Sequence, residues 1–417
     1  MAYDEPAFRR RGADGPEPAA RGARDDTTAD LAGPPRRVSP AVLDDVFDDP
    51  EHGEPGRDRM AVHAVWEVVL LLAVAAVALL LYRAEPAALR GAALNSLLVY
   101  VSGLLLLALG VGLSLRVGAV NLAAGPVAVA SALHFAEQGD RGVLVAGGTA
   151  ALAAAAFGLV LAVVVVGLQV PGWAGSVAAI LVVAVFVQRR TEPVAVQGGY
   201  EPTEHSVYVF GVAAGLTLIG GLLGTVKSVR RTVGRFRPVA DPARRRGALA
   251  GVLTAGGITL SMVFAAGAGV LFAAGGTGPV APGTGLDLTG LALGAALLGG
   301  TSAFGRRGGV FGTLLAVVLT GLFITYNGVQ QWRISLLLIA ATAILGGLVV
   351  TRLVERYGRP RSAGDNDRDW SGAGADPGAD GWSTGGRTES WSSALPAESA
   401  GTRTASWEGD SWGGPAR

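Results

Sequence analysis

The chain contains no cysteine, and only 16% of its residues are charged. Without cysteine it can form no disulfide and offers neither a thiolate nucleophile nor a cysteine metal site. Lysine is almost absent, since Lys227 is the only one, and histidine occurs four times. The formal net charge of +1 gives no electrostatic reason to expect a nucleic-acid partner.

Hydrophobic residues, in contrast, make up half of the chain. They are concentrated between about residues 61 and 350, in blocks close to the roughly 20 residues that a helix needs to cross about 30 Å of hydrocarbon. Segments such as 68–81 and 150–168 are apolar on every side of a helix rather than on one face. These features predict an all-α polytopic membrane protein whose immediate surroundings are lipid.

The composition divides the chain into three regions. We expect a transmembrane domain over 61–352 between a polar tail over 1–60 and a second tail over 353–417. The first tail is rich in Pro, Gly and Ala and lacks the apolar run of a signal peptide, and the second carries five of the eight tryptophans in a Gly/Ser/Asp background. Both tails are predicted to be disordered, because neither can bury enough apolar surface to offset the entropy of ordering. The tryptophans are either weak contacts for a partner or a neutral extension.

Ten segments of the middle region are predicted to be membrane spans. They are 61–82, 91–113, 117–136, 142–168, 172–188, 206–226, 248–274, 286–302, 309–326 and 333–351. An even number puts both ends of the chain on one side. Positive residues are retained in the cytoplasm, and the largest group of them, eight between Lys227 and Arg246, lies on the same side as both tails. Both termini are therefore expected to be cytoplasmic, and the expected location, a bacterial plasma membrane, is what the family resemblance below implies.

Two of these segments contain helix-breaking residues. The third holds Gly118, Gly125 and Pro126, and the eighth holds Gly299 and Gly300. We expect each to be a broken or re-entrant helix. A membrane tolerates such a break only where the freed backbone groups face protein or a water-filled path.

The same two segments carry a family resemblance. Residues 118–125 read Gly-Ala-Val-Asn-Leu-Ala-Ala-Gly, and residues 299–314 follow the pattern Gly-Gly-Thr-Ser-x-x-Gly-x-x-Gly-x-Val-x-Gly-Thr-Leu. These strings, with Tyr326-Asn327-Gly328, resemble the permease subunits of ABC importers for ribose and branched-chain amino acids, and most of all the sugar branch. The resemblance covers about residues 90–352. The glycines that match the family motifs are Gly118, Gly125, Gly299, Gly300, Gly305, Gly308 and Gly312.

The resemblance implies a transport subunit rather than an enzyme. The sequence contains no Gly-x-x-x-x-Gly-Lys-(Ser/Thr) loop, so ATP and Mg²⁺ are expected on a separate ABC ATPase subunit. The further partners implied are an extracytoplasmic solute-binding protein and a second permease subunit, identical or different. The solute would be a monosaccharide or a similar small polar molecule.

The cytoplasmic loop before residue 248 is the expected contact with the ATPase. Gly234-Arg235-Phe236 resembles the opening of the family's coupling segment, but Val239-Ala240-Asp241-Pro242 departs from the pattern. A different interpretation is that this charge only anchors the topology. The candidate coupling residues are Arg230, Arg231, Arg235, Phe236, Arg237, Ala243, Arg244 and Arg245. A second departure is Arg306, where the family usually has glycine.

Asn121, Thr301 and Ser302 are the candidate pathway residues, because they are polar groups within the interrupted spans. They would either contact the passing solute or bond the opened backbone. The competing class is an ion-coupled secondary transporter, which needs ionisable groups at membrane depth. Only His63, Glu67 and His134 come near that requirement. A non-transporting membrane scaffold is a further alternative.

Overall fold

The computed structural model describes residues 60–226, 248–303 and 310–358, all in the first of two compact units, and their regular structure is helical. Within these ranges there is no β-strand, and a single isolated bridge joins Val194 to Val280. The α-helices are α2 (Met60–Ala84), α3 (Gly91–Arg116), α4 (Ala124–Gln138), α5 (Val143–Ala162), α6 (Gly172–Val187), α7 (Ser206–Thr225), α9 (Ala248–Gly275), α10 (Leu286–Leu298), α11 (Gly312–Val329) and α12 (Leu336–Gly358). A π-helical turn, Val163–Gly167, extends α5.

Seven helices in the described ranges are long and apolar enough to cross a membrane. The other three, α4, α6 and α10, have 15, 16 and 13 residues. At about 1.5 Å of rise per residue they are about 20–24 Å long, shorter than a hydrocarbon layer of about 30 Å. The structure therefore supports an all-helical, membrane-embedded protein with seven candidate spans, where the sequence analysis expected ten.

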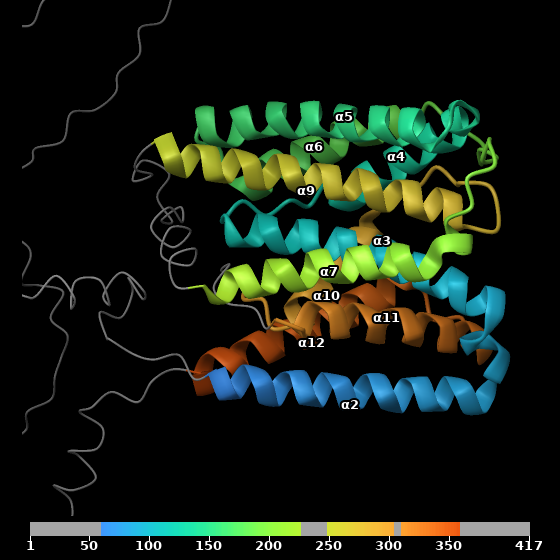
Figure 1. The fold of residues 1–417 in the computed structure, drawn as a ribbon. Coiled ribbons are helices and arrows are strands. Elements are labelled where there is room, and N and C mark those ends of the chain that lie inside the picture. Colours follow the sequence, from blue (N-terminus) through green and yellow to red (C-terminus); the bar gives the residue numbers. More distant parts are fainter. Residues whose placement is uncertain (1–59, 227–247, 304–309, 359–417) are drawn as a thin grey trace, which may run out of the picture. The chain divides into compact units, whose positions relative to one another are not determined.

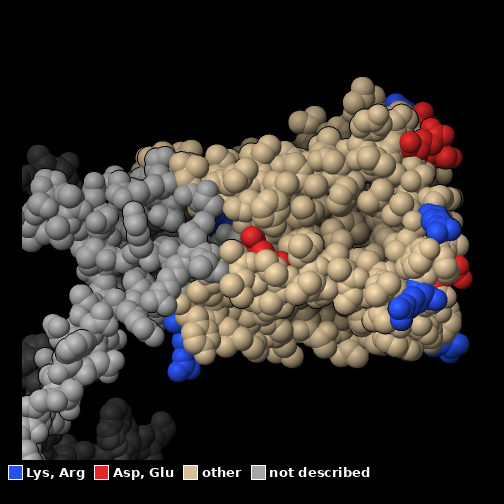
Figure 2. Space-filling model, turned by 60° about the horizontal axis from the view of Figure 1, so that its bottom comes forward, with Lys and Arg blue, Asp and Glu red and all other residues tan. Residues whose placement is uncertain are grey.

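The flank of the helical bundle is apolar. Figure 2 shows charged side chains gathered mainly at the two ends of the bundle, with a broad belt between them that is almost free of charge. Large hydrophobic side chains on this flank are exposed, including Leu144 at 87% and Leu152 at 71%. Such a surface suits lipid rather than water.

Helices α3 and α9 form the centre of the bundle. They pack against each other, with α4 and α5 against α9, and with α7, α10 and α11 against α3 (Figure 1). Gly103 and Gly269 allow close approach, since a Cβ at either position would overlap Phe272 or the backbone of Ala128. Helix α2 is the most peripheral span and packs mainly on α11 and α12.

The short helices α4 and α10 begin beside each other inside the bundle and run toward opposite ends (Figure 1). Helix α3 reaches one end of the bundle, and segment 117–123 leads back inward to the start of α4. Helix α9 reaches the other end, and segment 276–285 leads back inward to the start of α10. The two long-helix, segment, short-helix units thus have inverted directions, an arrangement known from membrane transporters.

Glycine makes the meeting of α4 and α10 possible. A Cβ on Gly125 would overlap the carbonyl oxygen of Gly285 and the Thr289 hydroxyl. Gly285 itself has a φ of 67°, in the left-handed region that favours glycine.

Gly125→Ala should therefore destabilise the fold by about 1–3 kcal/mol, because the new methyl group has no space without moving backbone. The measurement is the thermal unfolding midpoint of the purified chain in detergent. Gly112→Ala is the matched control, since a Cβ on that glycine of α3 would meet nothing within 4 Å. Equal midpoints for the two variants would show that the α4–α10 contact is looser than described.

Candidate functional site at the interrupted helices

The first interruption follows the end of α3. The amide of Gly118 donates to the carbonyl of Leu115 at 3.0 Å, and the amide of Ala119 donates to that of Ser114 at 3.0 Å. Gly118 has a φ of 70°, so this turn needs a residue without a Cβ. The chain then runs without regular structure until α4 begins at Ala124.

Asn121 holds this non-helical segment in place. Its side chain is buried, and its amide oxygen accepts a hydrogen bond from the backbone N–H of Ala123 at 3.0 Å. Its amide nitrogen donates to the hydroxyl of Ser261 on α9 at 3.0 Å, and its own backbone N–H donates to the hydroxyl of Ser114 at 3.0 Å. The geometry favours the backbone-bonding role for Asn121 over solute contact.

Two hydroxyl side chains from other helices complete the bonding of the segment. Thr289 on α10 accepts from the backbone N–H of Gly125 at 3.0 Å and lies 3.1 Å from the carbonyl oxygen of Leu122, to which it donates. Ser176 on α6 has its hydroxyl 2.5 Å from the carbonyl oxygen of Val120. Sequence reasoning missed Thr289, Ser176 and Ser261. Their only signal is a hydroxyl side chain within an apolar helix, single in α6 and α10 and one of three in α9.

The second interruption, at the end of α10, repeats the first turn. The amide of Gly300 donates to the carbonyl of Leu297 at 2.9 Å, and that of Thr301 donates to Ala296 at 3.0 Å. Gly300 has a φ of 85°. Thr301 and Ser302 follow directly, and both side chains are buried.

The peripheral helix α2 supplies polar groups to this second interruption. The carboxylate of Glu67 accepts from the backbone N–H groups of Phe311 at 2.8 Å and Gly312 at 3.2 Å, at the start of α11. The indole N–H of Trp66 donates to the carbonyl of Leu298, the last residue of α10, at 2.7 Å. Adjacent residues of α2 thus cap the end of one helix and the start of the next, and a carboxylate suits the positive end of a helix.

Glycine also brings α10 and α11 together at this point. A Cβ on Gly312 would overlap the backbone of Gly299, and a Cβ on Gly299 would overlap that of Thr313. Both glycines belong to the sequence motif, so their spacing is explained here by close backbone packing.

The remaining motif residues and the coupling loop lie outside the described residues. This applies to Gly305, Arg306 and Gly308, and to the candidate coupling residues between Arg230 and Arg245. Their roles stay predictions.

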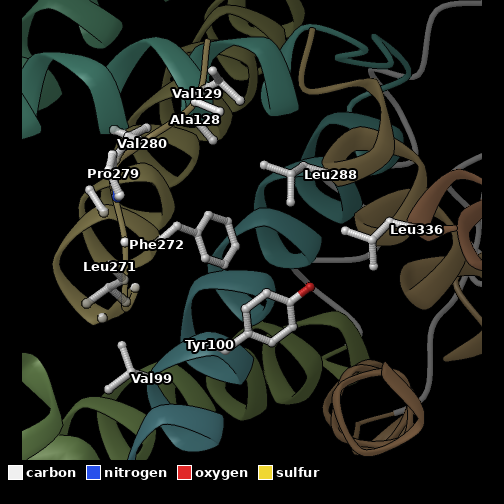
Figure 3. A pocket seen from close by; sticks show the side chains of 16 residues that line it. Val99, Tyr100, Ala128, Val129, Leu271, Phe272, Pro279, Val280, Leu288 and Leu336 are labelled. Atoms are coloured by element: carbon white, nitrogen blue, oxygen red, sulfur yellow. The ribbon is translucent and has the colours of Figure 1, made fainter. Parts of the chain in front are cut away.

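A cavity of about 370 Å³ lies toward the end of the bundle at which α9 finishes (Figure 3). It is lined by residues of α3, α4 and the last turns of α9, by segment 278–281, and by Leu288 and Leu336. Gly276, Gly278 and Pro279 are exposed, so the cavity reaches the surface at this end. None of the sequence-predicted pathway residues lines it.

In the described residues, the fold is an all-helical, apolar bundle in which two interrupted helical units run in opposite directions. No protein-family model, curated protein or solved structure matches the chain.

Asn121→Ala should lower the free energy of unfolding by about 1–3 kcal/mol, because it leaves the Ala123 amide and the Ser261 hydroxyl without their partner. Thermal unfolding without added solute is the measurement. Ser261→Ala serves as the second arm of a double-mutant cycle, and the double variant should lose less than the sum of the two single losses. Unchanged stability of Asn121→Ala would contradict the backbone role.

Glu67→Ala should cost about 1–2 kcal/mol of stability, the usual effect of removing a helix cap. Glu67→Gln should lose less, since it keeps a carbonyl oxygen that can accept. The control is Glu201→Ala, because this exposed glutamate precedes the short helix Pro202–His205 but its carboxylate makes no capping hydrogen bond. If Glu67→Ala is as stable as this control, the cross-helix cap does not stabilise the fold.

Proposed function

We propose that this chain is the membrane-spanning permease subunit of an ABC importer for a monosaccharide or a similar small polar solute. The observation that carries the proposal is that the family-like strings and the helix interruptions occur at the same positions. The two strings that resemble the family are the two places where helices are interrupted, at 117–123 and after Leu298. Glycine interrupts helices in any family, so the support comes from the whole strings, which match the family in polar residues such as Asn121 and Thr301 as well as in glycine.

The orientation follows from the ends of the helices and the sequence. Helix α2 begins and α12 ends at the same end of the bundle (Figure 1), which supports termini on one side. The arginine-rich segments 227–247 and 304–309 connect helices at that same end, so the positive-inside rule makes it cytoplasmic. In this orientation each re-entrant segment and its short helix together cross the bilayer, and the ten predicted segments form ten crossings of a bacterial plasma membrane.

Transport is driven by partners in this proposal. A separate ATPase binds ATP and Mg²⁺ and docks on the 227–247 loop, and its closure tilts the helices as rigid bodies between outward-open and inward-open states. A second permease subunit completes the pathway, and an extracytoplasmic binding protein delivers the solute. The second interruption, next to Arg306, is the other place where ATPase movement would reach the bundle.

The arrangement favours this class over an ion-coupled carrier. Glu67, the acidic residue that the sequence pattern singled out, uses its carboxylate to cap α11. A carboxylate committed to two backbone amides is poorly suited to bind and release a proton during each cycle. Asp287, in the first turn of α10, is a second acidic residue inside the bundle, so the comparison with an ion-coupled carrier applies to Glu67 only.

Reconstitution with candidate ATPase and binding proteins tests the proposal. We expect an ATPase subunit to co-purify with the chain and to hydrolyse ATP in lipid in response to loaded binding protein. Changing Arg230, Arg231, Arg235 and Arg237 together to lysine keeps the positive charge that anchors topology but removes the planar guanidinium contacts. This variant should insert normally and lose coupled ATPase activity. Co-purification of no ATPase, with uptake indifferent to loss of 227–247, would refute the importer role.

A further inference from the structure

The exposed aromatic side chains of the bundle are confined to the ends of its helices. Seven phenylalanine, tyrosine and tryptophan side chains are exposed in the described residues: Tyr82, Trp173, Phe186, Tyr208, Phe311, Trp332 and Tyr357. Six of them lie within two residues of a helix terminus, and Trp332 lies in the turn between α11 and α12. Exposed aliphatic side chains follow no such rule, since Leu152 and Leu181 are exposed in the middle of α5 and α6.

These seven side chains form two groups, one at each end of the bundle. Trp173, Phe311 and Tyr357 lie at the end where α2 begins and α12 ends (Figure 1), and the others lie at the opposite end. Figure 2 shows that the charged side chains gather mainly at the same two ends. Along the bundle, a layer of charge is therefore followed by aromatic rings, an aliphatic flank, aromatic rings and charge again.

This order matches the profile of a lipid bilayer. Tryptophan and tyrosine concentrate at the two membrane–water interfaces, because the ring packs against acyl chains while the indole N–H or phenol O–H bonds to water and head groups. The two aromatic groups therefore lie where the hydrocarbon layer of a surrounding bilayer ends.

The turn that carries Trp332 holds its indole in an outward position. The backbone there is strained, since Gln331 and Arg333 have φ values of 56° and 57°, in the left-handed region that residues other than glycine rarely adopt. The side-chain amide of Asn327 keeps the turn closed, because it accepts from the backbone N–H of Ile334 at 3.2 Å and donates to the carbonyl of the same residue at 3.1 Å. The indole packs edge-on against a tyrosine ring of α11, with 5.3 Å between centroids, yet the residue stays 51% exposed.

The distance between the two groups fits a bilayer at α11 and α12. Phe311 and Trp332 flank α11, which has 18 residues, and Trp332 and Tyr357 lie at the two ends of α12, which has 23. At a rise of about 1.5 Å per residue these helices are about 27 and 35 Å long, close to a hydrocarbon layer of about 30 Å. On α6, in contrast, Trp173 and Phe186 are only 13 positions apart, which corresponds to about 20 Å.

The flank of α6 is suited to lipid along its whole length. Val177, Leu181 and Val185 are all exposed on it. The polar residues Gln169 and Gln188 lie just beyond its two ends, so the apolar stretch cannot extend further in either direction. A bilayer adapts to a hydrophobic stretch that is too short by becoming thinner around it.

We propose that these seven aromatic side chains are two phospholipid-binding belts, which hold the bundle at the head-group levels of the bilayer, and that the pair on α6 thins the bilayer beside that helix. The partner is the glycerophosphate region of phospholipids, whose phosphate and ester oxygens accept hydrogen bonds from indole and phenol groups. This inference goes beyond the proposed function, because it uses the membrane embedding of the bundle and not the import role.

Tryptophan fluorescence in vesicles of phosphatidylcholine and phosphatidylglycerol tests the proposal. The vesicles carry a nitroxide quencher either on the lipid head group or at the middle of the acyl chain. The full-length chain is compared with Trp173→Phe and with Trp332→Phe, and the difference in emission isolates each indole. Phe186→Trp adds a probe at the other end of α6. Leu152→Trp and Leu181→Trp are the matched controls, since both positions are exposed in the middle of a helix.

We expect the head-group quencher to be the more effective one for Trp173, Trp332 and Phe186→Trp, and the acyl-chain quencher to be the more effective one for both control variants. The order along α6 is then shallow, deep and shallow, the result for a short helix that crosses a thinned bilayer. The unfolding midpoint of each variant should stay close to that of the parent, because every substituted side chain is exposed.

Quenching of Trp173 or Trp332 mainly from the acyl chain would place that ring too deep and overturn the belts. Quenching by aqueous iodide alone would show that the rings face water, and quenching by neither reagent would show that protein covers them; either result overturns the lipid assignment. If Phe186→Trp is as deep as Leu181→Trp, the bilayer is not thinned at α6. None of these outcomes depends on an ATPase or a solute, so the importer role succeeds or fails separately.

Discussion

A peptide group that leaves a helix inside a hydrocarbon layer has no water to bond, and each unsatisfied group costs several kcal/mol. Around 117–123, neutral side chains meet part of this constraint: Asn121 of the segment, Ser114, Ser176 and Thr289 bond to the backbone, and Ser261 holds the Asn121 side chain. Neutral partners satisfy the backbone without burying a charge. Since they come from α3, α6, α9 and α10, the same bonds that permit the break also fix how those helices pack.

The bonds at the junction of α4 and α10 therefore restrict how these two helices can move against each other. The units that contain α4 and α10 enter the bundle from different ends. They meet at Thr289, whose hydroxyl bonds to the carbonyl of Leu122 before the start of α4 and to the amide of Gly125 within it. A change in the angle between α4 and α10 must stretch those bonds. A movement of α4 against α10 therefore acts directly on the backbone, because Gly125 and Gly285 have no side chains at this contact.

The predictable part of this structure is local. Apolar runs located the helices, and Gly118 and Gly300 marked turns because both adopt a positive φ. The span count was less predictable, since length in residues does not distinguish the non-helical residues 117–123 from a helical turn. Partners distant in sequence gave no signal at all: Thr289 bonds to Gly125 across 164 positions, and Glu67 to Phe311 across 244.

The position of α2 bears on how the chain is made. This helix is synthesised before the other described helices, yet its main neighbours, α11 and α12, are the final two of them, and its polar contacts from Trp66 and Glu67 reach Leu298, Phe311 and Gly312. About 220 residues of chain are synthesised between α2 and its main packing partners. At about 5–20 residues per second this takes some tens of seconds, during which α2 lies in the bilayer without those partners. Its span is the least buried of the seven candidates and strongly apolar, which suits a helix that must remain in lipid before its partners are made.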